Sequence, residues 1–143
     1  MIIGFTGTRR GMTEQQLLTV ERLINGRDAY EFHHGDCIGA DKEAHQIAQR
    51  LEVDVVIHPP EDTKFRAWCT GIENEVRHTA MILPSKPYLQ RNQDIVDSCD
   101  LLIATPGEPL EVLRSGTWST VRKGRKKKST EVIVVYPNGE IGS

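Results

Sequence analysis

The sequence predicts an α/β fold, with a central, mostly parallel sheet of about five strands between two layers of helices. Three observations predict it. Short apolar runs alternate with segments of helical periodicity along the chain. The runs are nearly continuous in apolar residues, as parallel strands buried on both faces are. The 143 residues suffice for one domain with a substantial core, which we expect to span residues 1–143.

Five apolar runs are the expected strands. They are residues 1–5 (MIIGF), 30–35 (YEFHHG), 53–60 (VDVVIHPP), 100–106 (DLLIATP) and 131–139 (EVIVVYPNG). If the order across the sheet is third, second, first, fourth, fifth, the first and fourth strands are neighbours. The loops that follow them then face each other.

Helical segments separate most of these strands. Thr13 can cap the first helix and Gln16 can close a capping box with it, and apolar residues then fall on one helical face. Further helices are expected from about residue 40, over 88–98 and over 116–127. Residues 61–87 lack clean periodicity, so we expect a short irregular helix there and a long loop over the strand ends.

Composition and charge argue against several classes of protein. Cys37, Cys69 and Cys99 form no CxxC pair, so neither a disulfide nor a metal site is expected, and no cofactor is expected either. No signal peptide and no apolar run of membrane-spanning length is visible, so we expect a cytoplasmic protein without a membrane partner. A net charge of −2 argues against a general nucleic-acid coat protein.

The candidate ligand-binding residues follow the strands, because ligands of open parallel sheets bind beyond the carboxyl ends of the strands. Helix N-termini there attract phosphate, and arginine and threonine side chains add donors. The motif GFTGTRRG (4–11) matches neither the dinucleotide fingerprint nor a Walker A loop, which disfavours dehydrogenase and kinase chemistry. The candidates are Gly7, Thr8, Arg9, Arg10, Gly35, Asp36, Gly39, Asp41, Thr105, Pro106, Arg114, Ser115, Gly116 and Thr117.

Each of these residues also has an ordinary structural role open to it. Gly7 can belong to a tight turn, and Arg9 and Arg10 can be solvated loop charges. Asp36 and Asp41 can serve as caps or turn formers. The basic run 122–128 (RKGRKKK) suits the C-terminal turn of a helix more than a nucleic-acid patch. The coincidence of several signals at one edge of the sheet favours a binding site.

Four segments, in their order and spacing, resemble the SLOG superfamily of Rossmann-like proteins. They are GFTGTRRGMT (4–13), HHGDCIGADKEAH (33–45), RNQDIVDSCDLLIATP (91–106) and RSGTWSTVRKGRK (114–126). The superfamily includes LOG-type phosphoribohydrolases, nucleic-acid-binding DprA proteins and small YspA-like proteins often found in phages and their hosts. The YspA-like group is the most similar, and the likeness spans nearly the whole chain.

The resemblance implies a nucleotide or nucleotide-derived ligand at the strand ends. Some relatives cleave the N-glycosidic bond of nucleoside monophosphates, and others sense cyclic ADP-ribose-type signals. The resemblance also brings Arg91 and Asn92 to the ligand site or to a dimer interface; a surface position on their helix is the plain alternative. Because relatives commonly pair, a homo-oligomer, dimer or higher, is expected.

One departure from the LOG-type motif PGGxGTxxE bears on catalysis. Its glutamate takes part in hydrolysis, and aligning Gly116 and Thr117 with the motif's GT places Thr120 at that position. A threonine can neither act as a carboxylate base nor stabilise an oxocarbenium ion. Asp36 and Glu75 are the candidates for a substitute carboxylate.

Three functions remain open from the sequence. The first is a protein that binds a nucleotide or nucleotide-derived small molecule, of ADP-ribose or nucleoside monophosphate type, as a sensor, carrier or sequestering protein. The alternative is a nucleotide N-glycoside hydrolase or transferase. The third is a DprA-like single-strand binder that uses residues 122–128, although nucleic acid is not the expected partner.

Overall fold

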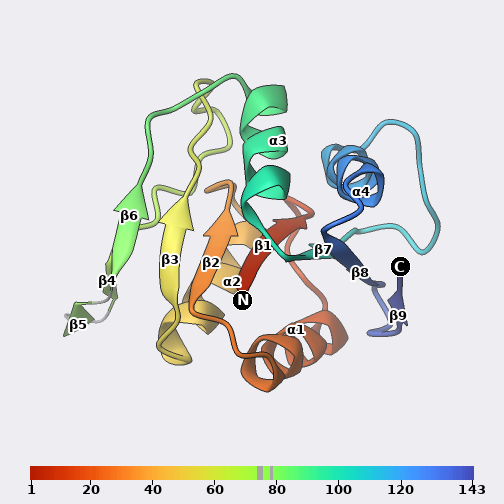
Figure 1. Ribbon diagram of the computed structural model, residues 1–143, viewed down its shortest axis with the longest axis horizontal. Helices are drawn as coiled ribbons and strands as arrows, with labels where there is room; N and C mark the ends of the chain where they lie inside the picture. The colour runs from red at the N-terminus through yellow and green to blue at the C-terminus, as the bar shows by residue number, and fades with distance from the viewer. Residues whose placement is uncertain (74–75, 78) are drawn as a thin grey trace.

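The computed structural model describes residues 1–73, 76–77 and 79–143 (Figure 1). The helices are α1 (Glu14–Gly26), α2 (Ala40–Arg50), α3 (Tyr88–Ser98) and α4 (Gly116–Lys126). The strands are β1 (Ile2–Gly7), β2 (Glu31–His34), β3 (Asp54–Ile57), β4 (Ile72–Glu73), β5 (Val76–Arg77), β6 (Ala80–Ile82), β7 (Leu101–Thr105), β8 (Glu131–Val135) and β9 (Ile141–Gly142).

The main sheet is mostly parallel and confirms the expected fold class. Its order among the described strands is β6-β3-β2-β1-β7-β8-β9, with β9 antiparallel to β8 and the remaining pairs parallel. The five expected strands therefore have the expected order, with β1 beside β7. The short strands β6 and β9 extend the sheet at its two edges.

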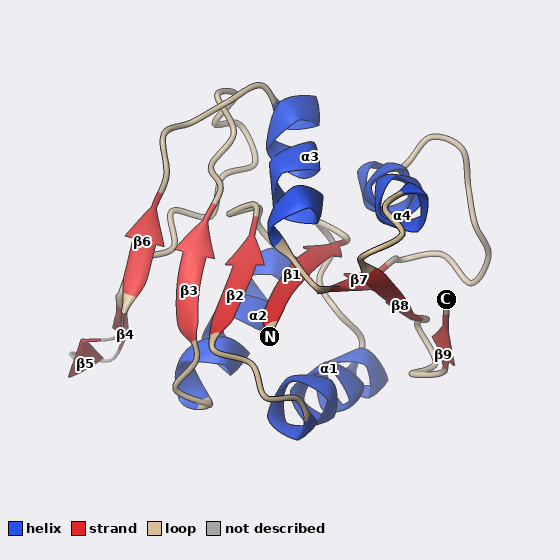
Figure 2. Cartoon of the chain, in the orientation of Figure 1, coloured by secondary structure: helices blue, strands red, loops and turns tan. Residues whose placement is uncertain are grey.

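Two helical layers cover the sheet on opposite sides (Figure 2). Alternate residues of each strand face the two layers, because successive side chains of a strand point to opposite faces. In β7, Leu101 and Ile103 pack in the core beneath α1 and α2, whereas Leu102 and Ala104 pack with α3 and α4. Trp118 of α4 is fully buried in that second core.

The capping box at the start of α1 forms as expected. The Thr13 hydroxyl accepts a hydrogen bond from the Gln16 amide at 3.1 Å, and the Gln16 side chain accepts one from the Thr13 amide at 3.0 Å. No helix among the described residues combines the length and the hydropathy needed to span a membrane.

The expectation for residues 61–87 was wrong in one respect. The described part of this segment contains no helix; it contains β4, β5 and β6 instead. Strand β6 pairs in parallel with Val55–Ile57 of β3. Without β6, the backbone N–H and C=O groups on the outer edge of β3 would have no partners in the sheet. Ala80 and Met81 are therefore extended, because they pair with this edge. The long loop is present over residues 58–71.

Candidate ligand-binding cleft

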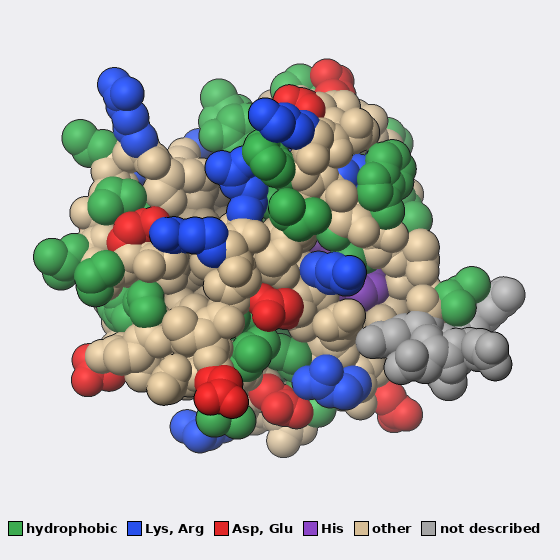
Figure 3. All heavy atoms as spheres, turned by 180° about the vertical axis from the view of Figure 1, so that it is seen from behind, with side chains coloured by type: hydrophobic (Ala, Val, Ile, Leu, Met, Phe, Trp, Pro, Cys, Tyr) green, Lys and Arg blue, Asp and Glu red, His purple; other side chains and the backbone are tan. Residues whose placement is uncertain are grey.

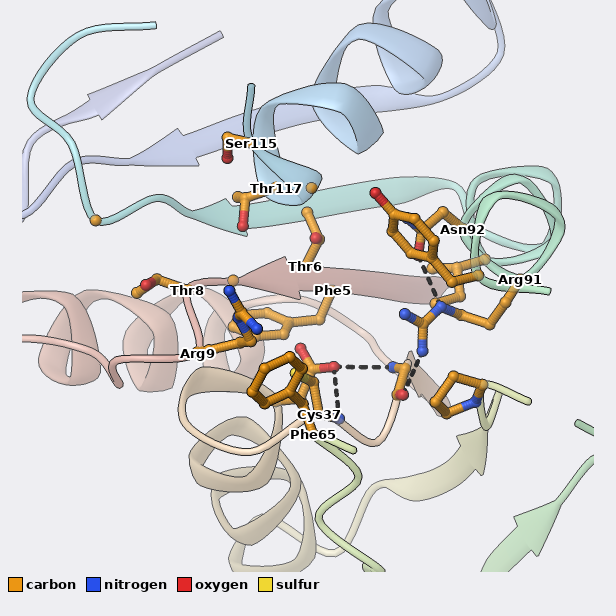
Figure 4. A pocket seen from close by; sticks show the side chains of 18 of the residues that line it. Phe5, Thr6, Thr8, Arg9, Cys37, Phe65, Arg91, Asn92, Ser115 and Thr117 are labelled. Carbon is orange, nitrogen blue, oxygen red and sulfur yellow. Dashed lines mark hydrogen bonds between the residues drawn. The ribbon is translucent and has the colours of Figure 1, made fainter. Parts of the chain in front are cut away.

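A cleft of about 680 Å³ lies beyond the carboxyl ends of the parallel strands (Figure 4). Five segments line it: the end of β1 with its loop, the β2–α2 connection, the loop after β3, the first half of α3, and the β7–α4 connection. Twelve candidates from the sequence meet there: Gly7, Thr8, Arg9, Arg10, Gly35, Asp41, Arg91, Asn92, Arg114, Ser115, Gly116 and Thr117.

Backbone hydrogen bonds of Thr8 hold the loop after β1 against the loop after β2. Its carbonyl accepts hydrogen bonds from the amides of Gly11 at 3.2 Å and Ala40 at 3.0 Å, and its amide donates to Thr105 O at 3.1 Å. Gly39 has a φ of 85°, and a Cβ there would lie 2.8 Å from Thr8 O. Glycine is therefore required at residue 39 for both its conformation and its close contact with the neighbouring loop.

Three exposed arginines surround the mouth of the cleft. Arg10 pairs with Glu108 at 3.0 Å, so its charge is partly neutralised within the chain. The guanidinium carbon of Arg9 lies 3.9 Å from the centroid of the Phe65 ring. Arg114 makes no hydrogen bond or ion pair with any residue that the structure describes. Arg9 and Arg114 thus keep their hydrogen-bond donors free for an anion.

Arg91 is a buried arginine in the wall of the cleft, and only 9% of its surface is exposed. Its Nε donates to Asn92 Oδ1 at 2.7 Å, and its Nη1 donates to the carbonyls of Gly35 and of His58. The alternative that Arg91 and Asn92 are ordinary helix-surface residues is wrong. A buried guanidinium charge strengthens the positive potential of the cleft, because it is poorly screened by water.

Asp41 is a buried carboxylate at the start of α2. It accepts hydrogen bonds from the amides of Gly35 at 3.2 Å and Cys37 at 3.1 Å. Burial raises the pKa of Asp41 to about 6, although these amides and the charge of Arg91 act in the opposite direction. Asp41 therefore forms the turn between β2 and α2 and does not cap the helix, whose N-cap is Gly39. It also places a carboxyl group that titrates near neutral pH in the cleft.

The N-terminus of α4 forms the wall opposite α2. Ser115 caps the helix, and its hydroxyl accepts a hydrogen bond from the Trp118 amide at 3.2 Å. The amides of Gly116 and Thr117 have no hydrogen-bond acceptor within the described chain, as expected for the first positions of a helix. Two free amides, the Thr117 hydroxyl and the positive end of the helix dipole therefore adjoin the cleft.

Four candidates from the sequence do not line the cleft: Asp36, Gly39, Thr105 and Pro106. Asp36 is the main correction, because its fully buried carboxylate is held by Arg66 Nε at 2.8 Å and the Cys69 amide at 2.9 Å. It therefore does not face the space where a substrate would bind. Thr105 is also fully buried, at the point where β7 meets β1.

Two further residues bear on catalysis: Glu75, a candidate substitute carboxylate, and Thr120, at the position of the glutamate in the LOG-type motif. Glu75 lies outside the described residues. Thr120 is buried, and its hydroxyl donates to Gly116 O at 2.9 Å inside α4. Its side chain is thus used within the helix and does not line the cleft.

Sequence reasoning missed ten residues that line the cleft: Phe5, Thr6, Cys37, Pro60, Asp62, Phe65, Tyr88, Ile95, Gly107 and Glu108. The rule that ligands bind beyond strand ends could have identified Thr6 and Gly107, since both are next to residues already chosen as candidates. Phe65 and Asp62 had no such signal. They reach the cleft because the loop after β3 folds back toward β2, where Ile38 N donates to Phe65 O at 2.9 Å.

Two buried pairs of histidines lie beside the cleft, on opposite faces of β2. His33 Nδ1 lies 2.7 Å from His58 Nε2, and His34 Nε2 lies 2.9 Å from His45 Nδ1. Burial, and then the neighbouring His33, lowers the pKa of His58 to about 4. Burial also places the pKa of His34 well below its usual value. Both histidines are therefore neutral at pH 7.

His34, His45 and Cys69 lie close enough to raise the question of a metal site, with ligand atoms within 4.8 Å of one another. The hydrogen bonds argue against one. Asp36 N donates to His34 Nδ1 at 2.9 Å, which leaves the proton of neutral His34 on Nε2, the atom that would have to bind the metal. Burial, and then the nearby Asp36, raises the pKa of the Cys69 thiol and disfavours the thiolate.

The basic run 122–128 is largely engaged within the chain. Arg122 and Arg125 both pair with Glu111, at 2.9 and 2.7 Å, and Lys127 Nζ donates to two carbonyls at the end of α3. The opposite face of the molecule, seen in Figure 3, also has basic and acidic side chains interspersed. The run completes the C-terminal turn of α4 and is not a free cationic surface.

Comparisons with known proteins agree on architecture. No family model matches the sequence, and no curated protein matches it. Among solved structures, DNA processing protein A (DprA) from Streptococcus pneumoniae has a TM-score of 0.65 at 17% identity, over 92% of this chain and 49% of DprA. This chain thus spans about half the length of DprA.

A second kind of neighbour is the molybdenum cofactor carrier protein of Chlamydomonas reinhardtii. Two structures of it match at 19% identity, with TM-scores of 0.62 and 0.56, over 97% and 93% of this chain and 76% and 74% of the carrier. DprA and the carrier are both Rossmann-like proteins of the SLOG type. At these identities the likeness concerns the fold, and the chain accordingly has a SLOG-type, Rossmann-like fold.

Proposed function

We propose that the protein binds a nucleotide or nucleotide-derived small molecule in the cleft, as a sensor, a carrier or a sequestering protein. One observation carries the proposal: free donors from separate parts of the chain converge on a single cavity. Arg9 and Arg114 are exposed at its mouth, and the Gly116 and Thr117 amides are unpaired at its wall. A phosphate group satisfies such a set of donors.

The size of the cavity supports a ligand larger than phosphate alone. A volume of about 680 Å³ lies within the range of about 300–1,000 Å³ that is typical of small-molecule sites. The cleft also contains polar groups, such as Asn92 and Asp41, that suit hydroxyl groups of a sugar. The neighbour described as a cofactor carrier adds support, since a protein of this fold carries a small molecule.

The test is a calorimetric titration with nucleoside monophosphates, NAD, ADP-ribose and cyclic ADP-ribose isomers. We expect at least one to bind, and Arg114→Ala to weaken its binding by about 10- to 100-fold, the loss of a charge-assisted hydrogen bond of about 1.5–3 kcal/mol. Arg22→Ala is the matched control, because Arg22 is exposed on α1 and does not line the cleft. Mass spectrometry of molecules released on denaturation can identify a co-purified ligand directly.

The proposal would be refuted if no ligand gave a heat of binding in calorimetry and mass spectrometry found no co-purified molecule. Equal losses in Arg114→Ala and Arg22→Ala would show that general charge, rather than the cleft, governs binding. The two variants change net charge by the same amount, so their comparison is free of that effect.

A second function has one observation in its favour. Asp41 places a carboxyl group with a pKa of about 6 in the cleft, as a general acid or base near neutral pH requires. We propose nucleotide N-glycoside hydrolysis as the alternative, with Asp41 in place of Asp36 as the candidate carboxylate. Release of free base by the wild type, abolished in Asp41→Asn, supports it; no release over long incubation refutes it.

A further inference from the structure

The loop after β3 brings one aromatic side chain, Phe65, into the cleft. Phe65 keeps 38% of its surface exposed, and the guanidinium carbon of Arg9 lies over its ring, 3.9 Å from the ring centroid. In Figure 4 the pair lies on the other side of the β1 end from Ser115 and Thr117. A guanidinium over a phenyl ring is a cationic, polarisable group that attracts aromatic rings, and both residues line the cavity.

This arrangement is anchored at Asp36, beneath the loop. The carboxylate of Asp36 accepts hydrogen bonds from Arg66 Nε at 2.8 Å and Cys69 N at 2.9 Å, and its carbonyl accepts one from Ala67 N at 2.8 Å. Asp36 has a left-handed φ of 57°, a conformation that costs free energy for a residue with a Cβ. These hydrogen bonds hold the backbone that follows Phe65 in place before any ligand binds, and the bond from Ile38 N to Phe65 O holds Phe65 itself.

The two ends of the cleft therefore differ in chemistry. The α4 end offers amides, hydroxyls and Arg114, which suit phosphate. The Phe65 end offers a half-exposed phenyl ring with two cations beside it, because Arg9 Cζ lies 3.9 Å and Lys64 Nζ lies 5.1 Å from the ring centroid. Fused or single heteroaromatic rings stack on such surfaces largely irrespective of their substituents.

We propose that the ligand carries a flat heteroaromatic ring and that this ring stacks on the Arg9–Phe65 pair while its phosphate binds at the start of α4. The inference rests on the proposed function and deepens it, because it assigns the base of the ligand to Arg9 and Phe65 and its phosphate to the start of α4. Asp36 is a positioning residue for this end of the cleft, in place of the catalytic role considered from the sequence.

The same loop contains a matched control. Arg66 lies 3.9 Å from the ring centroid of Trp68, so it repeats the arginine–aromatic stack, but Trp68 does not line the cleft. Trp68 is 59% exposed. Replacement of either aromatic residue by leucine removes one such stack from the same loop, and only one of the two replacements alters the cleft.

The experiment measures binding of AMP, GMP, CMP, UMP and ribose 5-phosphate by calorimetry to the wild type, Phe65→Leu, Phe65→Tyr and Trp68→Leu. We expect the wild type to bind at least one nucleotide more tightly than ribose 5-phosphate. Phe65→Leu should lose about tenfold in affinity for that nucleotide, the usual effect of one stacked base, and keep its affinity for ribose 5-phosphate. Phe65→Tyr should restore nucleotide binding, and Trp68→Leu should change neither.

The outcomes separate the two proposals. If the wild type binds ribose 5-phosphate as tightly as every nucleotide, the ring site is wrong and the proposed phosphate-binding cleft stands. An equal loss of both ligand types in Phe65→Leu also overturns the ring site, since Phe65 would then act on the phosphate end or on the fold. If the wild type binds none of the five compounds, the ring site and the proposed binding of nucleoside monophosphates both fail.

Discussion

Gly7→Ala is predicted to destabilise the protein by about 3 kcal/mol, because residue 7 is where β1 meets both β7 and α2. A Cβ at residue 7 would lie 2.5 Å from the Cβ of Ala40, and ordinary contact begins at 3.4 Å. It would also collide with Thr105 Oγ1. The hydroxyl of Thr105 can rotate away, but the Cβ of Ala40 is fixed to the backbone of α2.

The size of the effect follows from what has to move. The start of α2 would have to retreat by about 1 Å, which strains the 3.0 Å bond from Ala40 N to Thr8 O. Overpacking of this kind costs about 1–3 kcal/mol, and we take the upper end because a helix, rather than a side chain, is displaced. A change of about 3 kcal/mol is a large part of the total stability of a domain.

Urea unfolding followed by tryptophan fluorescence measures the change; Trp68 is already 59% exposed, so the change in emission comes mainly from Trp118. Trp118 is fully buried, so its emission reports loss of the core, and a lower midpoint at an unchanged slope is the expected result. Gly26→Ala is the control: nothing lies within 4 Å of its added Cβ, and a helical alanine there should be neutral or stabilising by up to about 1 kcal/mol. A Gly7→Ala midpoint equal to that of wild type would refute the described packing of β1 against α2.

Three further results are expected. In Gly116→Ala the new methyl group, with only Tyr88 as a neighbour at 3.9 Å, should leave the urea midpoint unchanged but weaken nucleotide binding in calorimetry; undiminished affinity would separate Gly116 from the ligand. Thr13→Ala should lower the free energy of unfolding by about 1 kcal/mol through loss of the N-cap, and no change in urea unfolding would show that the cap is dispensable. His58 has a folded pKa of about 4, below its unfolded value, so its contribution to stability is lost as pH falls from about 6.5 toward 4. Between pH 7 and pH 5, the free energy of unfolding of His58→Gln should therefore fall by about 2 kcal/mol less than that of the wild type, as measured by urea unfolding. Equal decreases in the two proteins would contradict a neutral, buried His58.

The raised pKa of Asp41 acts on stability in the opposite sense. Its folded pKa of about 6 exceeds the unfolded value, so the penalty for burying its charge disappears as pH falls through about 6 toward 4. The effects of His58 and Asp41 overlap in this pH window and partly cancel in the wild type. This is why the variant, rather than the wild-type profile alone, isolates the contribution of His58.

Much of the fold could be predicted from local pattern. The run DLLIATP became β7, and the helix over residues 88–98 begins and ends where expected. These predictions succeed because a continuous apolar run, a capping residue or a proline acts on the backbone within a few residues. The region around β6 failed the same approach, because Ala80 and Met81 are extended only through their pairing with Val55 and Val56.

Part of the candidate site could likewise be predicted from the sequence, and part of it depends on contacts between distant segments. The edge of the sheet where Thr8, Arg114 and Gly116 meet follows from the parallel order of the strands, and the sequence alone therefore determined it. The roles of Asp36 and Phe65 were decided only in the tertiary structure. Asp36 is bonded to residues about thirty positions further along, and these contacts turn its carboxylate into the core and bring Phe65 into the cleft. Local sequence determines which backbone forms a strand or a helix, whereas the direction of a side chain in a loop depends on the distant segment that packs against it.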